Sequence, residues 1–220
     1  MDGHALEPNM QLLKETTNFR ERGEMPIVSK IFCSSMPVLL IVRRRPPVVN
    51  GGGFVVTDCS QKVLFKVDGC GIVGAKGELI LRDGYGEALL LIRRKGAMVE
   101  AVSIHRKWKA FSFNYEGSEK LVFSLKEPNL VCLTDNTIKI TVEPRISKKE
   151  WDFEINGSFP NKTCSIIDHK GDNIAQVGVK ELLPPSKDIY NVMIGPGIDQ
   201  AFVFGVIAIL DYIYDESTRC

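Results

Sequence analysis

Short runs of arginine and lysine are the residues of this chain whose type and spacing could do chemistry. They are Arg43-Arg44-Arg45, Arg93-Arg94-Lys95, Arg106-Lys107 with Lys109, and Lys148-Lys149. A guanidinium group binds a phosphate or carboxylate through two parallel hydrogen bonds, so triplets at a strand end could converge on one rim and hold an anionic headgroup. The same runs could instead be solvated strand ends that balance 27 acidic residues. With that alternative open, the candidate headgroup contacts are Arg43, Arg44, Arg45, Arg93, Arg94 and Lys95.

A glycine motif is the next candidate for chemistry. Residues 69–74 spell G-x-G-x-x-G, the dinucleotide fingerprint. That chemistry needs the third glycine to open a helix whose N-terminus faces the pyrophosphate. Residues 75–83 instead resemble a strand that leads into a hairpin, so the glycines are interpreted as a turn. We expect no bound cofactor.

Catalytic and metal-binding patterns are absent from the sequence. His4, His105 and His169 are isolated, and no cysteine has zinc-ligand spacing to another ligand. No nucleophile elbow of the G-x-S-x-G type occurs, and the carboxylates are dispersed. We therefore expect no catalytic residue, no metal and no enzymatic activity.

Composition and charge limit the partners and the compartment. The 220 residues carry a net charge of +1, whereas a dedicated nucleic-acid binder is expected to be strongly basic. Nucleic acid is therefore not an expected partner. The six cysteines form no C-x-x-C pair, and the N-terminus has no basic and apolar signal pattern. We expect an intracellular, cytoplasmic protein with reduced thiols.

The element around which the chain is organised is its last apolar stretch. Residues 201–210 contain no polar side chain, so a helix here must be buried on every side. The stretch spans roughly 15 Å, about half of a membrane's hydrocarbon core. Asp199 and Asp211 also flank it. We predict a central helix over about residues 198–215 and no transmembrane span.

The preceding residues favour β-structure. Residues 54–67, 79–92 and 164–177 each read as a strand, an aspartate-led turn and a second strand. Further alternating runs bring the total to about a dozen short strands. An antiparallel sheet of that length tends to close, and a barrel that wide has room for a helix. We predict a mainly β fold, an antiparallel closed barrel around the buried C-terminal helix, in residues 36–220. Residues 1–35 are predicted to form a flexible arm.

Several stretches resemble the plant LURP-one-related family. They are residues 53–58, 89–95, 103–108, 151–159 and 196–211, and the last two are the most specific. The resemblance implies a fold like that of the tubby C-terminal domain and the phospholipid scramblases, a twelve-stranded barrel around a hydrophobic helix. The chain departs from the family pattern at residues 69–77 and 43–47.

The resemblance also implies a range of functions. Related folds bind phosphoinositides or act on membranes, and family members are associated with plant defence responses. We expect a non-enzymatic barrel that binds anionic phospholipid at a membrane surface, or an unidentified protein partner, in defence signalling. The alternatives are a scramblase-like lipid transporter and a tubby-like DNA-associated regulator.

Overall fold

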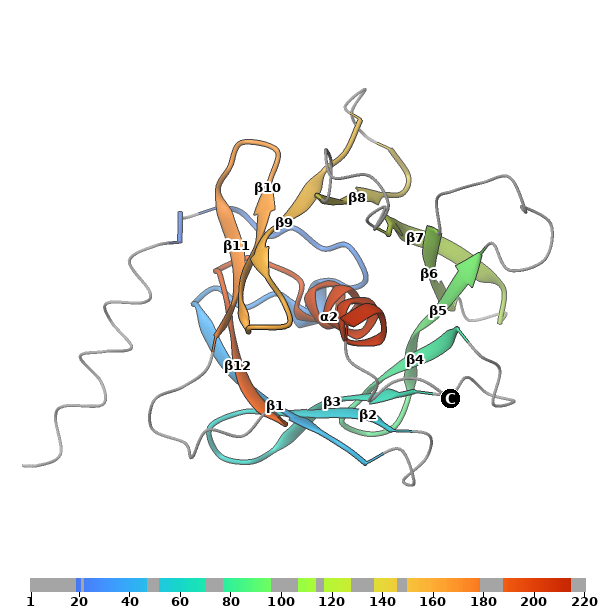
Figure 1. The fold of residues 1–220 in the computed structure, drawn as a ribbon, viewed down its shortest axis with the longest axis vertical. Coiled ribbons are helices and arrows are strands. Elements are labelled where there is room, and N and C mark those ends of the chain that lie inside the picture. Colours follow the sequence, from blue (N-terminus) through green and yellow to red (C-terminus); the bar gives the residue numbers. More distant parts are fainter. Residues whose placement is uncertain are drawn as a thin grey trace, which may run out of the picture.

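In the part of this protein that the structure describes, a closed β-sheet surrounds an α-helix. A computed structural model describes residues 19–20, 22–46, 52–69, 77–95, 107–113, 117–127, 137–145, 150–178 and 188–214. Within these residues, twelve antiparallel strands form a closed barrel around helix α2 (Gln200–Tyr214), as Figure 1 shows. The strands are β1 Val38–Arg44, β2 Gly53–Thr57, β3 Val63–Asp68, β4 Glu78–Asp83, β5 Ala88–Lys95, β6 Lys107–Phe113, β7 Glu119–Lys126, β8 Ile138–Val142, β9 Phe153–Ser158, β10 Thr163–Asp168, β11 Asn173–Gly178 and β12 Ile189–Ile194. The predicted fold class is confirmed.

Strand order around the barrel follows the order along the chain. Each strand pairs with the next one, and β12 returns to pair with β1, for example Leu40 opposite Val192. Closure satisfies the edge hydrogen bonds that an open sheet would expose. It also gives every strand one face toward the helix, which explains the alternating burial along strands such as β3 and β10.

Helix α2 fills the barrel because it has no polar face to turn toward water. Residues 201–212 are all buried, and rings from the sheet pack on the helix, with Phe65 5.4 Å from Phe204 and Phe123 5.2 Å from Phe202 between centroids. The helix begins two residues later than predicted, because Asp199 caps its first turn: its Oδ1 accepts hydrogen bonds from the backbone N–H groups of Ala201 and Phe202. Of the helices in the described residues, none combines the length and hydropathy that a membrane span requires.

The three predicted aspartate-led hairpins are confirmed, and they share one geometry. Asp58, Asp83 and Asp168 each accept hydrogen bonds at Oδ1 from the backbone N–H groups two and four residues further on, at distances of 2.8 to 3.0 Å. The side chain thereby replaces a backbone carbonyl in closing the turn. These turns connect β2 with β3, β4 with β5, and β10 with β11.

Part of the predicted flexible arm is packed on the barrel. The N-terminal segment, residues 22–34, includes the 3-10 helix η1 (Lys30–Phe32) and lies across the start of α2. Met25 donates a backbone hydrogen bond of 2.7 Å to Gly197, and Gly197 donates one of 2.7 Å to Ser34. This segment therefore belongs to the barrel domain. Residues 1–18 of the predicted arm lie outside the described residues.

Candidate anion-binding site on the barrel surface

The two predicted triplets, residues 43–45 and 93–95, contribute arginines to the same end of the barrel, where helix α2 ends. Arg44 of β1 donates from Nε to Oδ1 of Asp211 at 2.9 Å. The two side chains are only 10% and 0% exposed, and the Arg44 guanidinium lies 5.9 Å from the Tyr190 ring centroid. A cation near the last turn of a helix also complements the helix dipole. Arg44 thus stabilises the end of the barrel.

Arg94 of β5 is held in a second cluster at this end. Its Nε and one terminal nitrogen donate to the two carboxylate oxygens of Glu127 at 2.8 and 3.1 Å. The indole Nε1 of Trp108 donates to the same carboxylate at 2.8 Å. The Arg94 guanidinium also lies about 6 Å from the ring centroids of Trp108 and Tyr212. Arg94 therefore makes its bidentate hydrogen bonds to Glu127, and these donors are not free to bind a headgroup.

Arg45 and Arg93 also have carboxylate partners. Arg45 donates to Asp68 at 2.8 Å and to the carbonyl oxygen of Val67 at 2.5 Å. Arg93 donates from Nε to Glu78 and from a terminal nitrogen to Glu119, both at 2.8 Å. The hydrogen bond to Glu78 raises the pKa of the Arg93 guanidinium, while burial opposes the rise.

Arg43 and Lys95 are the two members of the predicted set whose side chains are exposed. Arg43 lies on β1 between Val55 of β2 and Ile189 of β12. Lys95 lies at the end of β5, so β2, β3 and β4 separate the two positions. The structure therefore brings most of the triplets together as structural ion pairs, and it leaves Lys95 on the outer surface of the barrel.

Lys95 is part of a row of three lysines, here called the lysine row: Lys95, Lys107 and Lys126. Lys95 of β5 is directly opposite Lys107 of β6, which is directly opposite Lys126 of β7. All three are exposed. Residues directly opposite one another in a sheet project from the same face, and like charges in such pairs destabilise the sheet. In the part of the chain that the structure describes, no carboxylate forms an ion pair with any of the three.

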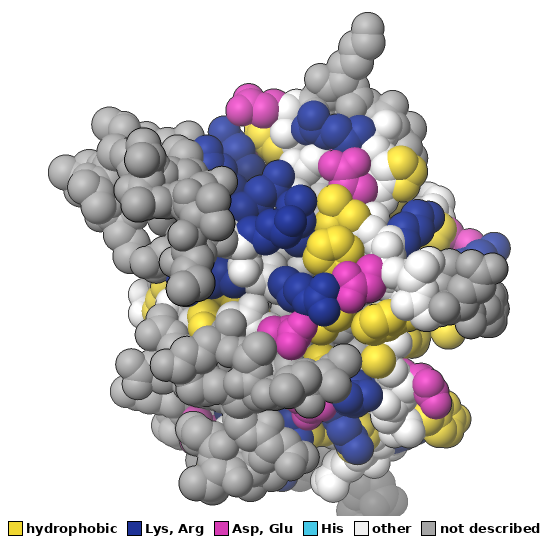
Figure 2. Space-filling view, turned by 90° about the vertical axis from the view of Figure 1, so that its right-hand side faces the viewer, with side chains coloured by type: hydrophobic (Ala, Val, Ile, Leu, Met, Phe, Trp, Pro, Cys, Tyr) yellow, Lys and Arg dark blue, Asp and Glu magenta, His cyan; other side chains and the backbone are white. Residues whose placement is uncertain are grey.

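The basic surface continues beyond the lysine row. Lys109 of β6 lies opposite Arg93 of β5 on the same face of the sheet. Figure 2 shows the side of the molecule on which β5, β6 and β7 lie in Figure 1, and Lys and Arg side chains gather in one part of it. Of the acidic groups on or beside these strands, Glu78, Glu119 and Glu127 are engaged by Arg93 and Arg94. The arrangement offers several ammonium groups to one anionic partner.

Lys126 was missed by the sequence analysis, although a signal for it exists. It follows directly after the strand-like run at residues 121–125, Lys95 ends the run at residues 89–95, and Lys107 immediately precedes Trp108. In a meander of antiparallel strands, the end of one strand lies beside the start of the next. Aligning the three runs in this way places the lysines in one row.

Other candidate groups carry no site within the described residues. No cluster of His, Cys, Asp or Glu that could hold a metal ion occurs among them. His169 is exposed in the β10–β11 turn, whereas His4 and His105 lie outside the described residues. Gly69 of the glycine motif follows β3, residues 70–76 are not described, and the chain resumes as β4.

The fold places this chain in the class of closed β-barrel proteins whose interior is filled by their own helix. Within that class, the chain belongs to the LURP-one-related family, whose model matches residues 38–211. It is similar to protein LURP-one-related 6 of Arabidopsis thaliana, with 55% identity over 195 residues that cover 88% of this chain and 98% of the relative. It is also similar to protein LURP-one-related 16 of the same organism, with 48% identity over 205 residues, 89% of this chain and 95% of the relative. No solved structure matches the chain, and the likeness to tubby and scramblase folds stays a prediction.

Proposed function

We propose that this protein is a non-catalytic barrel that binds anionic phospholipid headgroups at a membrane surface through the lysine row. The observation that carries the proposal is the direct cross-strand alignment of Lys95, Lys107 and Lys126. Such an alignment costs stability unless an anion compensates it. An anionic partner that is absent from the described residues would provide that compensation.

The dimensions of the row suit a phosphate-bearing surface. Neighbouring strands lie about 4.8 Å apart, so the outer lysines of the row are roughly 10 Å apart at the backbone. Lysine carries a compact charge on a flexible stem, which lets the ammonium groups adjust to phosphates at several positions. Each basic residue near an anionic membrane contributes about 1 kcal/mol of binding free energy. Three lysines in one row would then contribute about 3 kcal/mol, roughly a hundredfold in affinity for an anionic surface.

The setting of this binding in plant defence signalling rests on the family resemblance alone. The curated relatives carry family names, which state no ligand. The partner inferred from the structure itself is an anionic lipid surface.

Vesicle co-sedimentation tests the proposal. The purified full chain is mixed with vesicles of neutral lipid, of neutral lipid with phosphatidylserine, and of neutral lipid with phosphoinositide, at low salt and at about 0.15 M salt. We expect sedimentation with the anionic vesicles that persists at the higher salt, and none with the neutral vesicles. Equal recovery with neutral and anionic vesicles, or binding to duplex DNA that exceeds binding to vesicles, would contradict the proposal.

A further inference from the structure

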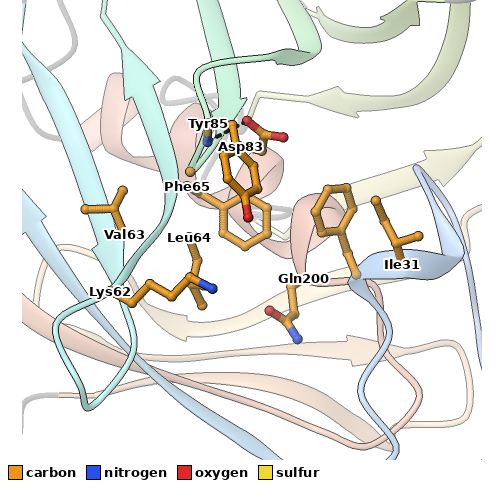
Figure 3. A pocket seen from close by; sticks show the side chains of 10 residues that line it. Ile31, Lys62, Val63, Leu64, Phe65, Asp83, Tyr85 and Gln200 are labelled. Atoms are coloured by element: carbon orange, nitrogen blue, oxygen red, sulfur yellow. Dashed lines mark hydrogen bonds between the residues drawn. The ribbon is translucent and has the colours of Figure 1, made fainter.

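A cleft lies at the end of the barrel where helix α2 begins, at the opposite end of the helix from the arginine ion pairs. It has a volume of about 480 Å³ and is formed by η1, the β2–β3 turn with the start of β3, the β4–β5 turn, and the first residue of α2. Figure 3 shows the side chains that line it. This volume falls within the range of small-molecule sites, roughly 300–1,000 Å³.

The walls of the cleft are aromatic and aliphatic, and Phe65 at its floor is held in place by packing against neighbouring rings. The ring of Phe65 is buried and contacts Phe32 at 5.3 Å and Phe204 of the helix at 5.4 Å between centroids. The rim is different, because Tyr85 is 91% exposed and Ile31 is 81% exposed. Burying that apolar surface under a ligand would release water at roughly 25 cal/mol per Å².

Two polar side chains are placed to receive the polar end of such a ligand. Lys62 and Gln200 both line the cleft, and neither side chain forms a hydrogen bond or ion pair within the described residues. The pKa of the nearby Asp58 carboxyl is lowered by a hydrogen bond from Ser60 and, to a smaller extent, by the Lys62 charge. Asp83 also lines it, but its Oδ1 accepts the backbone N–H groups of Tyr85 and Glu87 at 2.9 Å. In the view of Figure 3, the Asp83 carboxylate and the Lys62 ammonium lie on opposite sides of the Phe65 ring. The Lys62 side of the cleft is therefore suited to an anionic group.

We propose that this cleft binds a small planar aromatic anion, such as an aromatic carboxylate. The half-buried ring of Phe32 and the exposed ring of Tyr85 contact the aromatic body, since aromatic pairs favour offset or edge-to-face contacts at centroid distances of about 4.5–7 Å. The Lys62 ammonium pairs with the carboxylate, and the Gln200 amide donates a hydrogen bond to it. This site is separate from the lysine row and does not depend on lipid binding.

Calorimetric titration with three naphthalene probes tests the proposal: naphthoate, naphthylmethanol and naphthylmethylamine. They share one ring system and differ in the charge of the polar group. We expect saturable binding of naphthoate, weaker binding of the alcohol and the weakest binding of the amine. Lys62→Gln should weaken naphthoate binding roughly threefold to tenfold and abolish its advantage over the alcohol. Lys170→Gln, a neutralisation in a different hairpin turn, should change nothing.

A second variant tests the aromatic wall. Tyr85→Ala should weaken all three probes together, since it removes ring contact and no charge. Because Tyr85 is exposed, the variant should keep the wild-type melting temperature, which shows that the barrel is intact. The proposal is overturned if naphthoate does not saturate, if the amine binds more tightly than the carboxylate, or if Lys62→Gln and Lys170→Gln have equal effects.

Discussion

At the scale of single residues, Asp199 holds two distant segments of the chain together through hydrogen bonds from both of its carboxylate oxygens. One carboxylate oxygen accepts the backbone N–H groups of Ile27, Val28 and Ser29 at 2.7 to 3.0 Å. The other accepts the first N–H groups of helix α2. The side chain is fully buried, so it satisfies donors that water cannot reach. Asp199 therefore joins the N-terminal segment to the helix around which the barrel is built.

Removing this carboxylate should destabilise the whole domain. We expect Asp199→Ala to lower the free energy of unfolding by about 3 kcal/mol, because a helix cap is lost and buried N–H groups are left without acceptors. Urea denaturation followed by far-UV circular dichroism measures the change. Asp58→Ala is the matched control, since Asp58 makes similar backbone contacts in an exposed turn, and its effect should be much smaller. Equal losses in the two variants would contradict this role for Asp199.

Asp168 should make stability depend on pH. Burial by itself would raise the pKa of Asp168, but the N–H groups of Lys170 and Asp172 and the charge of Arg22 outweigh it, so its pKa lies below the ordinary value of 3.8. A lowered folded-state pKa means that the unfolded chain binds the proton more tightly. The stabilisation is therefore fully present well above pH 3.8 and declines as the pH falls through the folded-state pKa.

The Asp168→Asn variant measures that dependence. The difference in unfolding free energy between wild type and variant should be largest near neutral pH and should shrink below about pH 4. Chemical denaturation at a series of pH values provides the comparison. A difference that stays constant over the whole series would show that the Asp168 charge contributes nothing to stability.

At the scale of elements, helix α2 depends on one glycine for its fit. A Cβ atom on Gly205 would lie 2.9 Å from Cδ1 of Leu90 and 3.1 Å from Cζ of Phe123. Both side chains are fully buried and come from the surrounding sheet. The absence of a side chain at position 205 therefore lets β5 and β7 approach the helix, although glycine is a poor residue for a helix interior.

A large side chain at this position should not be accommodated. We expect Gly205→Leu to destabilise the protein by about 3 kcal/mol or more, because overpacking forces buried side chains away from their rotamers. Gly178→Leu is the control, since a Cβ atom at Gly178 would meet nothing within 4 Å. Differential scanning calorimetry compares the two. A Gly205→Leu variant that melts cooperatively at the wild-type temperature would contradict the packing of the helix described above.

At the scale of the whole molecule, local patterns were sufficient to predict the barrel. The length of the apolar run at residues 201–210 favours a buried helix over a strand, and Asp58, Asp83 and Asp168 each mark a hairpin turn through their own backbone contacts. Such signals lie within a few residues of one another, so they can be read without knowing the fold.

The parts that could not be predicted depend on contacts between distant residues. Arg44 and Asp211 are 167 positions apart, and Asp199 is 172 positions from Ile27. The sequence therefore showed arginine triplets but not that carboxylates engage four of their members. For Lys95, Lys107 and Lys126 it offered only their positions at strand ends, and the register that aligns them depends on cross-strand pairing.

The measurement that tests the central claim most directly compares two triple variants in vesicle binding. The row variant, Lys95→Gln with Lys107→Gln and Lys126→Gln, and the control variant, Lys30→Gln with Lys66→Gln and Lys170→Gln, remove the same charge from different surfaces. We expect the row variant to bind anionic vesicles roughly a hundredfold more weakly at low salt, at about 1 kcal/mol per lysine, and the control to bind nearly as wild type. Equal losses in both variants would mean that net charge alone drives the attraction, and would contradict a binding site on the lysine row.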